Sequence, residues 1–587
     1  MLSRVMTDTA TGVNAQAWRG PSALADQVAD AGKAWDDAGG TRRLWEKDAS
    51  LWTGADEARW LGWLGAVEAG RALLPALRDI ADGVRRDGFT HALLLGMGGS
   101  SLCPEVLART FGRQPGGLEF HVLDSTVPSQ VAAVESRVDL DRTLVIVASK
   151  SGSTLEPSAF QQYFFDRIAA VRGPAEAARR FVAITDPGSK LEGQATAAGY
   201  RHIVSGEPTI GGRYSALSPF GLVPAAVMGL DVAAFLDETA RMVDAIRSAP
   251  AAGNPGVALG LLLGTAAVAG RDKLTLIASP GIEGLGAWLE QLVAESTGKN
   301  GQSIVPVDLE ALAPPDRYGA DRVFVYLRLA TAPDAAQEAG VAALEAAGAV
   351  VVRIDVARPL AIGQEFFRWE IVTAVASHVM RLNPFDQPDV EASKIETKAL
   401  TSAYERDGSL PAETPAVSGG GLQIFADAKT TERLAAAAST GTPEGFLRAH
   451  LASLKAGDYV ALLAYVEMNA RHAGVLQRIR HSIRDRARVA TCVGFGPRFL
   501  HSTGQAYKGG SDKGVFLQIT ADDVRDLAVP GQAYTFGIIK AAQARGDIAV
   551  LAGRGRRVLR IHLGADVAAG LETLARLVDE APLTPAH

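Results

Sequence analysis

Two stretches decide the fold: LLLGMGGSSLCP at Leu93–Pro104 and VIVASKSGST at Val145–Thr154. Each is an apolar run typical of a buried strand, followed by a turn of small residues and then by a helical pattern. Backbone N–H groups at the start of a helix bind anions, and small residues let a ligand come close to them. Two such turns about 50 residues apart predict one phosphorylated ligand, held between neighbouring strand ends.

Strands and helices alternate on both sides of these stretches, which predicts parallel sheets covered by helices on both faces. In the first part of the chain the expected strands are 92–95, 119–123, 144–148, 181–185 and 201–204. Later strands are expected at 274–278, 322–327, 350–355, 459–466, 489–493, 515–519 and 558–563, with a helix at 469–486. Ligands of such sheets bind at the carboxyl ends of the strands.

The chain has 587 residues, which is too long for a single hydrophobic core. We expect an α/β protein with two doubly wound parallel-sheet domains, a helical N-terminal segment and an extra C-terminal α/β segment. The expected division is a helical segment at 1–89, α/β domains at 90–240 and 241–404, a linker at 405–435 and the C-terminal segment at 436–587. The linker is expected because ERDGSLPAETPAVSGGG is rich in Gly, Pro and Ser.

Composition and motif content disfavour several classes of partner. The net charge of −6 disfavours nucleic acid, and the two cysteines belong to no CxxC or Cys/His cluster, so we expect no metal. The first turn is not GxGxxG, which disfavours NAD. The start of the chain lacks the apolar core of a signal peptide, and the longest apolar run, 257–270, is too short to cross a bilayer. We therefore expect a cytoplasmic protein with no membrane partner, and a buried helix at 257–270.

The SKSGST turn gathers hydroxyls, an ammonium group and several backbone donors in six residues, Ser149–Thr154. A phosphate monoester dianion needs such a cluster of donors. An ordinary capped helix start is the structural alternative, but capping does not require four hydroxyls and a lysine together.

Two further side chains suit proton transfer. Glu295 lies near the end of a helix in WLEQLVAESTGKNGQ, where a carboxylate is suited to remove a proton next to a carbonyl. Arg213 follows two glycines in GGRYS, and a permanent cation suits an enediolate oxyanion. A surface glutamate and a salt bridge at a domain boundary are the respective structural alternatives.

Taken together, these motifs resemble those of the glucose-6-phosphate isomerase family. GMGGSS, SKSGST, GGRYS, AESTGK and NPFDQPDVEASK occur in the family's order over roughly residues 60–400. With RLWEKDASLWTG and GPRFLHSTGQAYKGG, the sequence is most similar to the isomerase half of bifunctional transaldolase/glucose-6-phosphate isomerases. A transaldolase barrel would need at least about 200 residues, and the first motif begins at Gly96.

The resemblance implies two SIS-type (sugar-isomerase) domains, a homodimer, a sugar-phosphate substrate, a cis-enediol intermediate and no cofactor. It implies that Glu295 is the base that moves the proton between C2 and C1, and that Arg213 steadies the enediolate. The other residues that it implies are the phosphate cradle Ser149, Lys150, Ser151 and Thr154, the first-turn residues Gly99 and Ser100, the substrate contact Gln387, and Lys394 near the ring oxygen.

One position departs from the family's pattern. Many members have a His after the Gly-Gln pair that assists ring opening, and this chain has Glu365 there. The pKa of an unperturbed Glu is about 4.3, so proton donation near neutral pH would need tuning by the environment. His378 in the same helix and His501 in the loop LHSTGQAYKGG are the other candidates for the ring-opening acid.

The leading expectation is interconversion of glucose 6-phosphate and fructose 6-phosphate. A bifunctional phosphoglucose/phosphomannose isomerase and a non-catalytic sugar-phosphate-binding protein remain as alternatives. A sensor needs the SKSGST cradle but not Glu295, Arg213 and Lys394 together.

Overall fold

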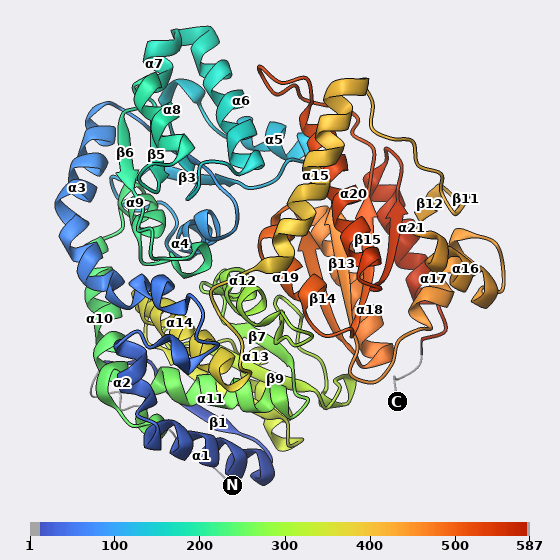
Figure 1. Cartoon of the computed structure of the whole chain (residues 1–587), viewed down its shortest axis with the longest axis horizontal. Coiled ribbons are helices and arrows are strands. Elements are labelled where there is room, and N and C mark those ends of the chain that lie inside the picture. Colours follow the sequence, from blue (N-terminus) through green and yellow to red (C-terminus); the bar gives the residue numbers. More distant parts are fainter. Residues whose placement is uncertain (1–11, 584–587) are drawn as a thin grey trace.

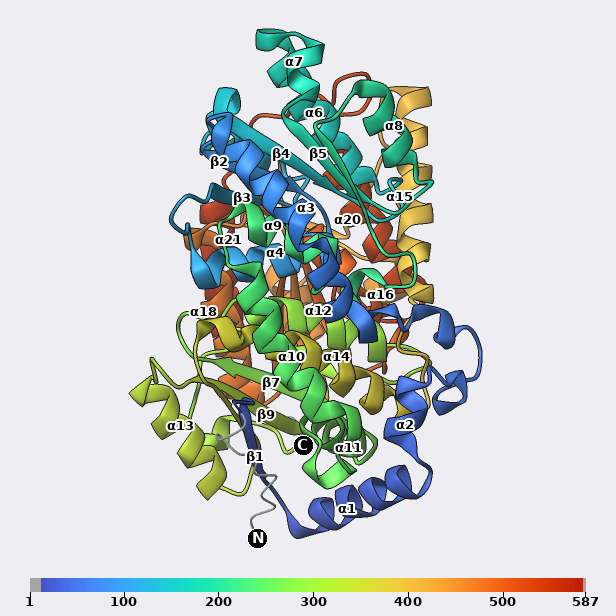
Figure 2. The same cartoon turned by 90° about the vertical axis from the view of Figure 1, so that its left-hand side faces the viewer.

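The strands of the chain form three sheets in the computed structural model, which describes residues 12–583. In Figure 1 the first sheet lies at the upper left, the second below it, and the third, from the C-terminal part of the chain, at the right. Figure 2 shows the same stacking from the side, with the first sheet above the second. The expected α/β class is confirmed.

The first sheet is parallel throughout, in the order β3-β2-β4-β5-β6. Its strands are β2 (His91–Leu95), β3 (Glu119–Leu123), β4 (Thr143–Ala148), β5 (Phe181–Thr185) and β6 (His202–Ser205). Alternate residues of β2 enter different cores, since Leu93 and Leu95 pack in one cluster and Ala92 and Leu94 in another.

Helices cover both faces of this sheet, as the apolar strands predict. On the face of Ala92 and Leu94 lie α3 (Ala66–Arg86), α4 (Leu102–Phe111) and α9 (Pro219–Val227). On the other lie α5 (Pro128–Glu135), α6 (Leu155–Arg172) and α8 (Lys190–Ala198).

The second sheet has the order β1-β10-β9-β7-β8, and every pair except β1–β10 is parallel. Its strands are β7 (Lys273–Ala278), β8 (Val305–Val307), β9 (Arg322–Leu329), β10 (Val350–Val356) and β1 (Ala15–Arg19). The strand β1 corrects the expectation of a wholly helical N-terminal segment. Its backbone completes the edge of the sheet beside β10, although more than 300 residues separate the two strands.

The apolar run at 257–270 forms the buried helix α11 (Pro255–Val268), as expected. Glycines at every fourth position bring it close to α14 (Ile362–Val379). A Cβ atom on Gly260 would lie 2.7 Å from the Cβ of Val375, and one on Gly264 would lie 2.7 Å from the Cβ of Val379. Because such separations are below van der Waals contact, only glycine allows this spacing of the two helices.

The third sheet has the order β11-β12-β16-β15-β13-β14, with a parallel core of four strands. Its parallel strands are β13 (Tyr459–Tyr465), β14 (Ala490–Phe495), β15 (Gly514–Thr520) and β16 (Arg557–His562). The hairpin of β11 (Val417–Gly419) and β12 (Leu422–Phe425) falls in the expected linker 405–435, and β12 pairs antiparallel with β16. Part of that segment is therefore an edge of the sheet.

The helix α15 (Pro388–Asp407) connects the second and third sheets and packs along α20 (Phe536–Gly553) (Figure 1). The approach is close, because a Cβ atom on Gly546 would lie 3.1 Å from the Cβ of Glu396. Around the third sheet the other helices are α16 (Ala428–Ala437), α17 (Pro443–Leu451), α18 (Ala470–Ala487), α19 (Gly504–Gly509) and α21 (Val567–Glu580).

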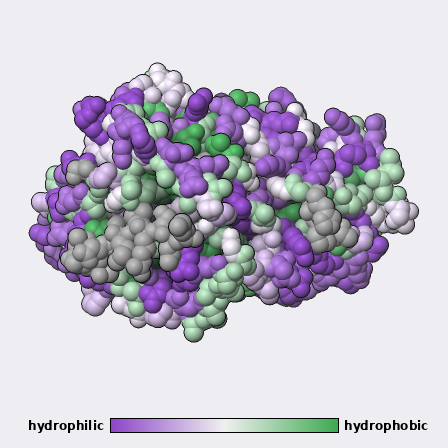
Figure 3. Space-filling model, turned by 90° about the horizontal axis from the view of Figure 1, so that it is seen from below, coloured by the Kyte–Doolittle hydropathy of each residue, from purple (hydrophilic) through white to green (hydrophobic). Residues whose placement is uncertain are grey.

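The face drawn in Figure 3 is mainly hydrophilic, and its hydrophobic residues are scattered in small groups. Within residues 12–583, none of the helices combines the length and the apolar character needed to cross a membrane.

Candidate functional site

A cleft of about 1060 Å³ lies where the first sheet, α15 and the C-terminal part of the chain meet. Its wall on the first sheet is the SKSGST turn at the carboxyl end of β4 together with the start of α6. The residues with phosphate-binding chemistry on its walls include Ser151, Gly152, Ser153, Thr154, Lys190, Lys394 and Lys398. Of the predicted site residues, Ser151, Thr154, Lys394 and His501 line this cleft, whereas Arg213, Glu295 and Gln387 are not among its lining residues.

The SKSGST turn is built for close approach. Gly152 has φ +65°, and a Cβ atom there would lie 2.3 Å from the backbone nitrogen of Leu191. Ser149 is buried, and its hydroxyl has no hydrogen-bond partner among the described residues. Ser151 and Ser153 share a hydrogen bond of 2.9 Å between their hydroxyls. The turn thus holds an unused buried hydroxyl and two exposed ones within a few residues of a helix start.

Lys150 differs from the expected phosphate cradle. Its ammonium group pairs with Asp186 and donates to the carbonyl oxygens of Glu207 and Pro208 at 3.2 and 3.3 Å. The structure therefore commits this cation to the neighbouring turns. The ammonium groups that line the cleft come from Lys190, at the start of α8, and from Lys394 and Lys398 on α15.

The first turn, Gly96–Ser101, acts as the contact point of three segments. A Cβ atom on Gly99 would lie 1.9 Å from the carbonyl oxygen of Gly212, so the GMGGSS and GGRYS turns touch through their backbones. A Cβ atom on Gly98 would lie 2.8 Å from both the side-chain Nε2 of Gln291 and the carbonyl oxygen of His501. Ser100 is half-buried in this turn.

Arg213 and Glu295 meet inside the protein. Arg213 is 3% exposed, and its Nη1 lies 3.5 Å from Oε1 of Glu295. Gln291, one helical turn earlier on α12 (Leu285–Thr297), donates to Oε2 of Glu295 at 3.0 Å. The carboxylate is thus buried, fixed at both oxygens and next to a permanent cation, which is what a positioned base requires.

The same arginine holds the loop that carries Gln387. Its Nη1 donates to Oε1 of Gln387 at 2.9 Å, and Nη2 donates to the carbonyl oxygens of Pro384 and Asp386 at 2.6 and 2.9 Å. Lys299 donates to the carbonyl oxygen of Asn383 at 2.7 Å. Burial and the nearby Arg213 lower the pKa of Lys299 to about 8, against the opposing effect of Asp386. Two cations therefore fix the NPFDQ loop against the Glu295 helix.

His501 comes to the cleft from the C-terminal part of the chain. Its Nε2 lies 2.8 Å from Oε1 of Glu156, and Gln543 donates to the same oxygen at 2.6 Å. Thr126 in turn donates to the Gln543 carbonyl oxygen at 2.8 Å. Burial opposes ionisation of Glu156, but the charge and hydrogen bond of His501 outweigh it and lower the pKa of this carboxyl. The contacts of Glu156 with His501 and Gln543 therefore hold its carboxylate in one orientation.

The other two ring-opening candidates lie elsewhere. Glu365 is fully buried, accepts from Nδ2 of Asn14 at 2.8 Å and lies 3.5 Å from Arg368, so it anchors the N-terminal segment. Burial raises the pKa of Glu365 despite the charge of Arg368. His378 bonds the carbonyl oxygen of Leu51 through Nδ1 and meets the ring of Trp35 edge-on at 5.1 Å. Of the three candidates, only His501 lines the cleft as the structure describes it.

Sequence reasoning missed Lys190, Glu156 and Gln543. Lys190 had a usable signal, because it follows a Pro-Gly-Ser turn at the carboxyl end of β5. Glu156 and Gln543 had none, since their importance comes from a contact between residues 387 positions apart.

The sequence of the chain is similar to those of phosphoglucose isomerases. Residues 81–310 match the family model described as phosphoglucose isomerase. This range includes both glycine turns, SKSGST and Glu295, and ends before Lys394 and His501.

Two curated relatives extend the comparison. The glucose-6-phosphate isomerase of Rubrobacter xylanophilus is 28% identical over 55% of this chain and 85% of its own length. That of Parasynechococcus marenigrum is 36% identical over 38% of this chain, and the match covers 41% of that relative, less than half its length. Among solved structures, a hypothetical protein from Thermus thermophilus has a TM-score of 0.54 and 25% identity, covering 65% of this chain and 99% of its own. The chain is therefore similar to phosphoglucose isomerases, with the match to the family model confined to residues 81–310.

Proposed function

We propose that the protein is an aldose–ketose isomerase that interconverts glucose 6-phosphate and fructose 6-phosphate. The observation that carries the proposal is the buried Glu295 carboxylate, fixed by Gln291 and 3.5 Å from Arg213, beside the glycine turn that contacts His501 at the cleft. A phosphate-binding protein without catalysis has no need of a buried, oriented carboxylate next to a cation. The names of the curated relatives support the same substrate pair.

The isomerisation step needs one base and one cation. Glu295 removes the proton from C2 of the open-chain aldose, giving a cis-enediol whose oxyanion faces a positive charge. The protonated carboxyl then returns the proton to C1, and the hydroxyl proton moves from O2 to O1, which gives the ketose. Arg213 stabilises negative charge in this step without titrating, because a guanidinium stays protonated at any ordinary pH.

Ring opening precedes this step and needs a proton on the ring oxygen and removal of the proton from the C1 hydroxyl. We assign the acid to His501, because it lines the cleft and is paired with Glu156. Lys394 lines the same cleft and supplies a positive charge near the ring. Ser149, Ser151 and Thr154, with Lys190, hold the phosphate at the other end of the sugar.

The remaining features of the proposal follow from the family resemblance and the composition. The protein works as a cytoplasmic homodimer in glycolysis and gluconeogenesis and binds no organic cofactor. The resemblance to the isomerase half of bifunctional transaldolase/glucose-6-phosphate isomerases stays a prediction.

The substitution Glu295→Gln tests the assignment. It keeps size and hydrogen bonding but removes the base, so formation of fructose 6-phosphate should fall by about 10²–10⁴-fold. Binding of glucose 6-phosphate, measured by calorimetry, should stay within a few-fold of the parent. Glu283→Gln, which changes a half-buried glutamate just before the same helix, is the control and should leave turnover unchanged. Retained turnover in Glu295→Gln would refute the role of this residue.

Mannose 6-phosphate distinguishes the alternatives. A bifunctional phosphoglucose/phosphomannose isomerase would convert it to fructose 6-phosphate, whereas a phosphoglucose isomerase would bind it at most as a competitor. A sugar-phosphate sensor would bind either sugar phosphate and form no product from it.

A further inference from the structure

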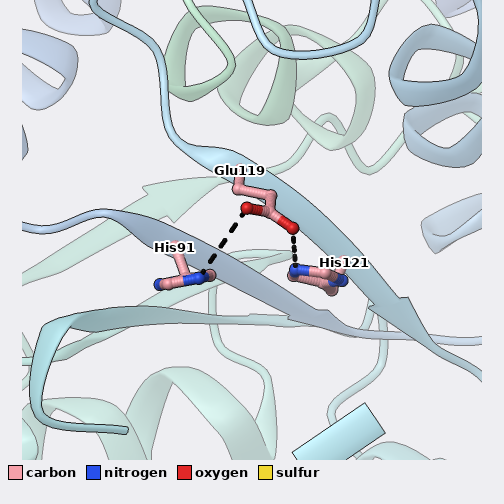
Figure 4. Close-up of side chains that lie close together, drawn as sticks. All are labelled: His91, Glu119 and His121. Atoms are coloured by element: carbon pink, nitrogen blue, oxygen red, sulfur yellow. Dashed lines mark ion pairs between the residues drawn. The ribbon is translucent and has the colours of Figure 1, made fainter. Parts of the chain in front are cut away.

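Two histidines and a glutamate converge on one face of the first sheet (Figure 4). His91 on β2 pairs in register with Glu119 on β3, and His121 lies two residues further along β3. Paired residues of neighbouring strands point to the same face, and so do residues two apart on one strand. The backbone of the sheet therefore sets all three side chains side by side.

The ligand atoms are spaced as a metal ion would need them. Nε2 of His121 lies 3.2 Å from Oε1 of Glu119, and Nε2 of His91 lies 3.8 Å from Oε2. One ligand atom from each residue lies within 4.8 Å of the others. Tetrahedral zinc with bonds of about 2.0–2.2 Å separates its ligands by roughly 3.4 Å. Small side-chain rotations therefore bring the three atoms to bonding distance.

Two details indicate that the nitrogens are available. Nδ1 of His91 is bonded to the hydroxyl of Thr90 at 2.8 Å, an outer contact of the kind that leaves Nε2 free for a metal. Nε2 of His121 is buried and makes no hydrogen bond, although it is close to Glu119.

We propose that His91, Glu119 and His121 bind one divalent transition-metal ion, with water in the remaining position. Two imidazoles and one carboxylate suit zinc, cobalt or nickel, whereas magnesium and calcium prefer oxygen ligands alone. The ion joins the edge strand β3 to β2 and so strengthens the border of the sheet. This proposal departs from the sequence-based expectation of no metal, which rested on the absence of CxxC and Cys/His clusters.

The ion would lie outside the substrate cleft. His91 is the first residue of β2, and the glycine turn that faces the active site follows Leu95 at the other end of the strand. Four residues of parallel strand span about 13 Å. The proposed ion therefore has a structural role, and its binding does not depend on the isomerase activity.

The test uses the full chain without an affinity tag, dialysed against EDTA and titrated with ZnCl₂ in competition with a chromogenic chelator. We expect one tight equivalent per chain, which His121→Ala weakens by more than about 100-fold. Zinc should raise the thermal unfolding midpoint of the parent but not that of the variant. His202→Ala, at the start of β6 in the same sheet, is the matched control and should bind like the parent.

A second variant distinguishes a loss of metal binding from a loss of folding. Glu119→Gln changes an exposed side chain, so it should fold, and it should also weaken zinc binding. Substitution with Co²⁺ should give the visible absorption of a nitrogen- and oxygen-ligated ion in the parent and not in His121→Ala. Binding that neither variant weakens, or binding only at millimolar zinc, would overturn the proposal, whatever the isomerase activity.

Discussion

The ion pair between His501 and Glu156 brings a titratable side chain to the cleft and fixes its orientation. Glu156→Gln keeps a hydrogen-bonding side chain but removes the charge that faces His501. If His501 opens the sugar ring, turnover of glucose 6-phosphate should fall by about 10²-fold or more, and its pH profile should change with the loss of the Glu156 charge.

The measurement compares turnover and its pH dependence for Glu156→Gln, His501→Asn and the control Glu405→Gln. Glu405 also lines the cleft, but it lies on the exposed side of α15. If Glu156→Gln and His501→Asn both kept the turnover and pH profile of the parent, the role of His501 in ring opening would be refuted. A purely structural role for Glu156 would lower the amount of folded protein without moving the profile.

For single residues, the sequence predicted which side chains belong to the candidate site better than it predicted the side chains they contact. The SKSGST turn, Arg213 and Glu295 could be located because each sits at a recognisable strand end or helix end. Lys150 was expected in the phosphate cradle. Its ammonium group pairs instead with Asp186, 36 residues away, a contact that the sequence does not reveal. Glu365 lies on α14, the helix that precedes the NPFDQ loop. Only the fold shows that its carboxylate accepts a hydrogen bond from Asn14.

Among the elements, the packing of α11 against α14 gives the clearest prediction. Gly260→Ala gains about 1 kcal/mol of helix propensity but places a Cβ atom 2.7 Å from Val375 and 2.8 Å from the carbonyl oxygen of Val372. Overpacking costs about 1–3 kcal/mol, so we expect net destabilisation. Gly193→Ala on α8 has nothing within 4 Å of its Cβ atom and should be stabilising. Denaturant unfolding of the parent and both variants checks this. A Gly260→Ala variant as stable as the parent would contradict the tight packing.

The central parallel strands were predictable, because buried strands between helices are long apolar runs. The strands β1, β8, β11 and β12 were not, since none is a continuous apolar run and three of them lie at sheet edges. In AQAWR, for example, polar residues interrupt the apolar pattern that would identify a strand. Their strand conformation comes from backbone pairing with a partner already in place, as β1 pairs with β10.

Across the whole molecule, the C-terminal part completes the cleft, a role that the sequence left open. The loop after β14 brings His501 to Glu156, and α20 brings Gln543 to the same carboxylate. No local pattern in the sequence encodes these contacts, which join the first sheet to the C-terminal part of the chain. The match to the phosphoglucose isomerase model ends at residue 310, so these contributions lie beyond it.

A buried charge network holds the C-terminal part in that position. Glu310 is paired with Arg322 at 2.9 Å, accepts from the hydroxyl of Thr491 at 2.8 Å and lies 4.0 Å from Arg480. Arg322 belongs to β9 of the second sheet, whereas Arg480 and Thr491 belong to α18 and β14. Burial disfavours the charge of Glu310, but Arg322 and Arg480 outweigh it and lower the pKa of this carboxyl.

Glu310→Gln should therefore loosen the joint between the second and third sheets. It leaves two buried guanidinium groups without their counter-charge, which costs about 3–5 kcal/mol of unfolding free energy. Turnover should fall as well, because displacement of the C-terminal part withdraws His501. Glu580→Gln breaks an exposed pair with Arg576 and should be nearly neutral.

The pH dependence separates this network from ordinary packing. Because the folded-state pKa of Glu310 lies below its ordinary value of 4.5, its stabilisation is complete above pH 4.5. It is lost as the pH falls through the lower folded-state pKa. The difference in unfolding free energy between the parent and Glu310→Gln should accordingly be constant at neutral pH and shrink in acid. A difference that stays the same down to about pH 3 would assign the loss to packing and not to the charge.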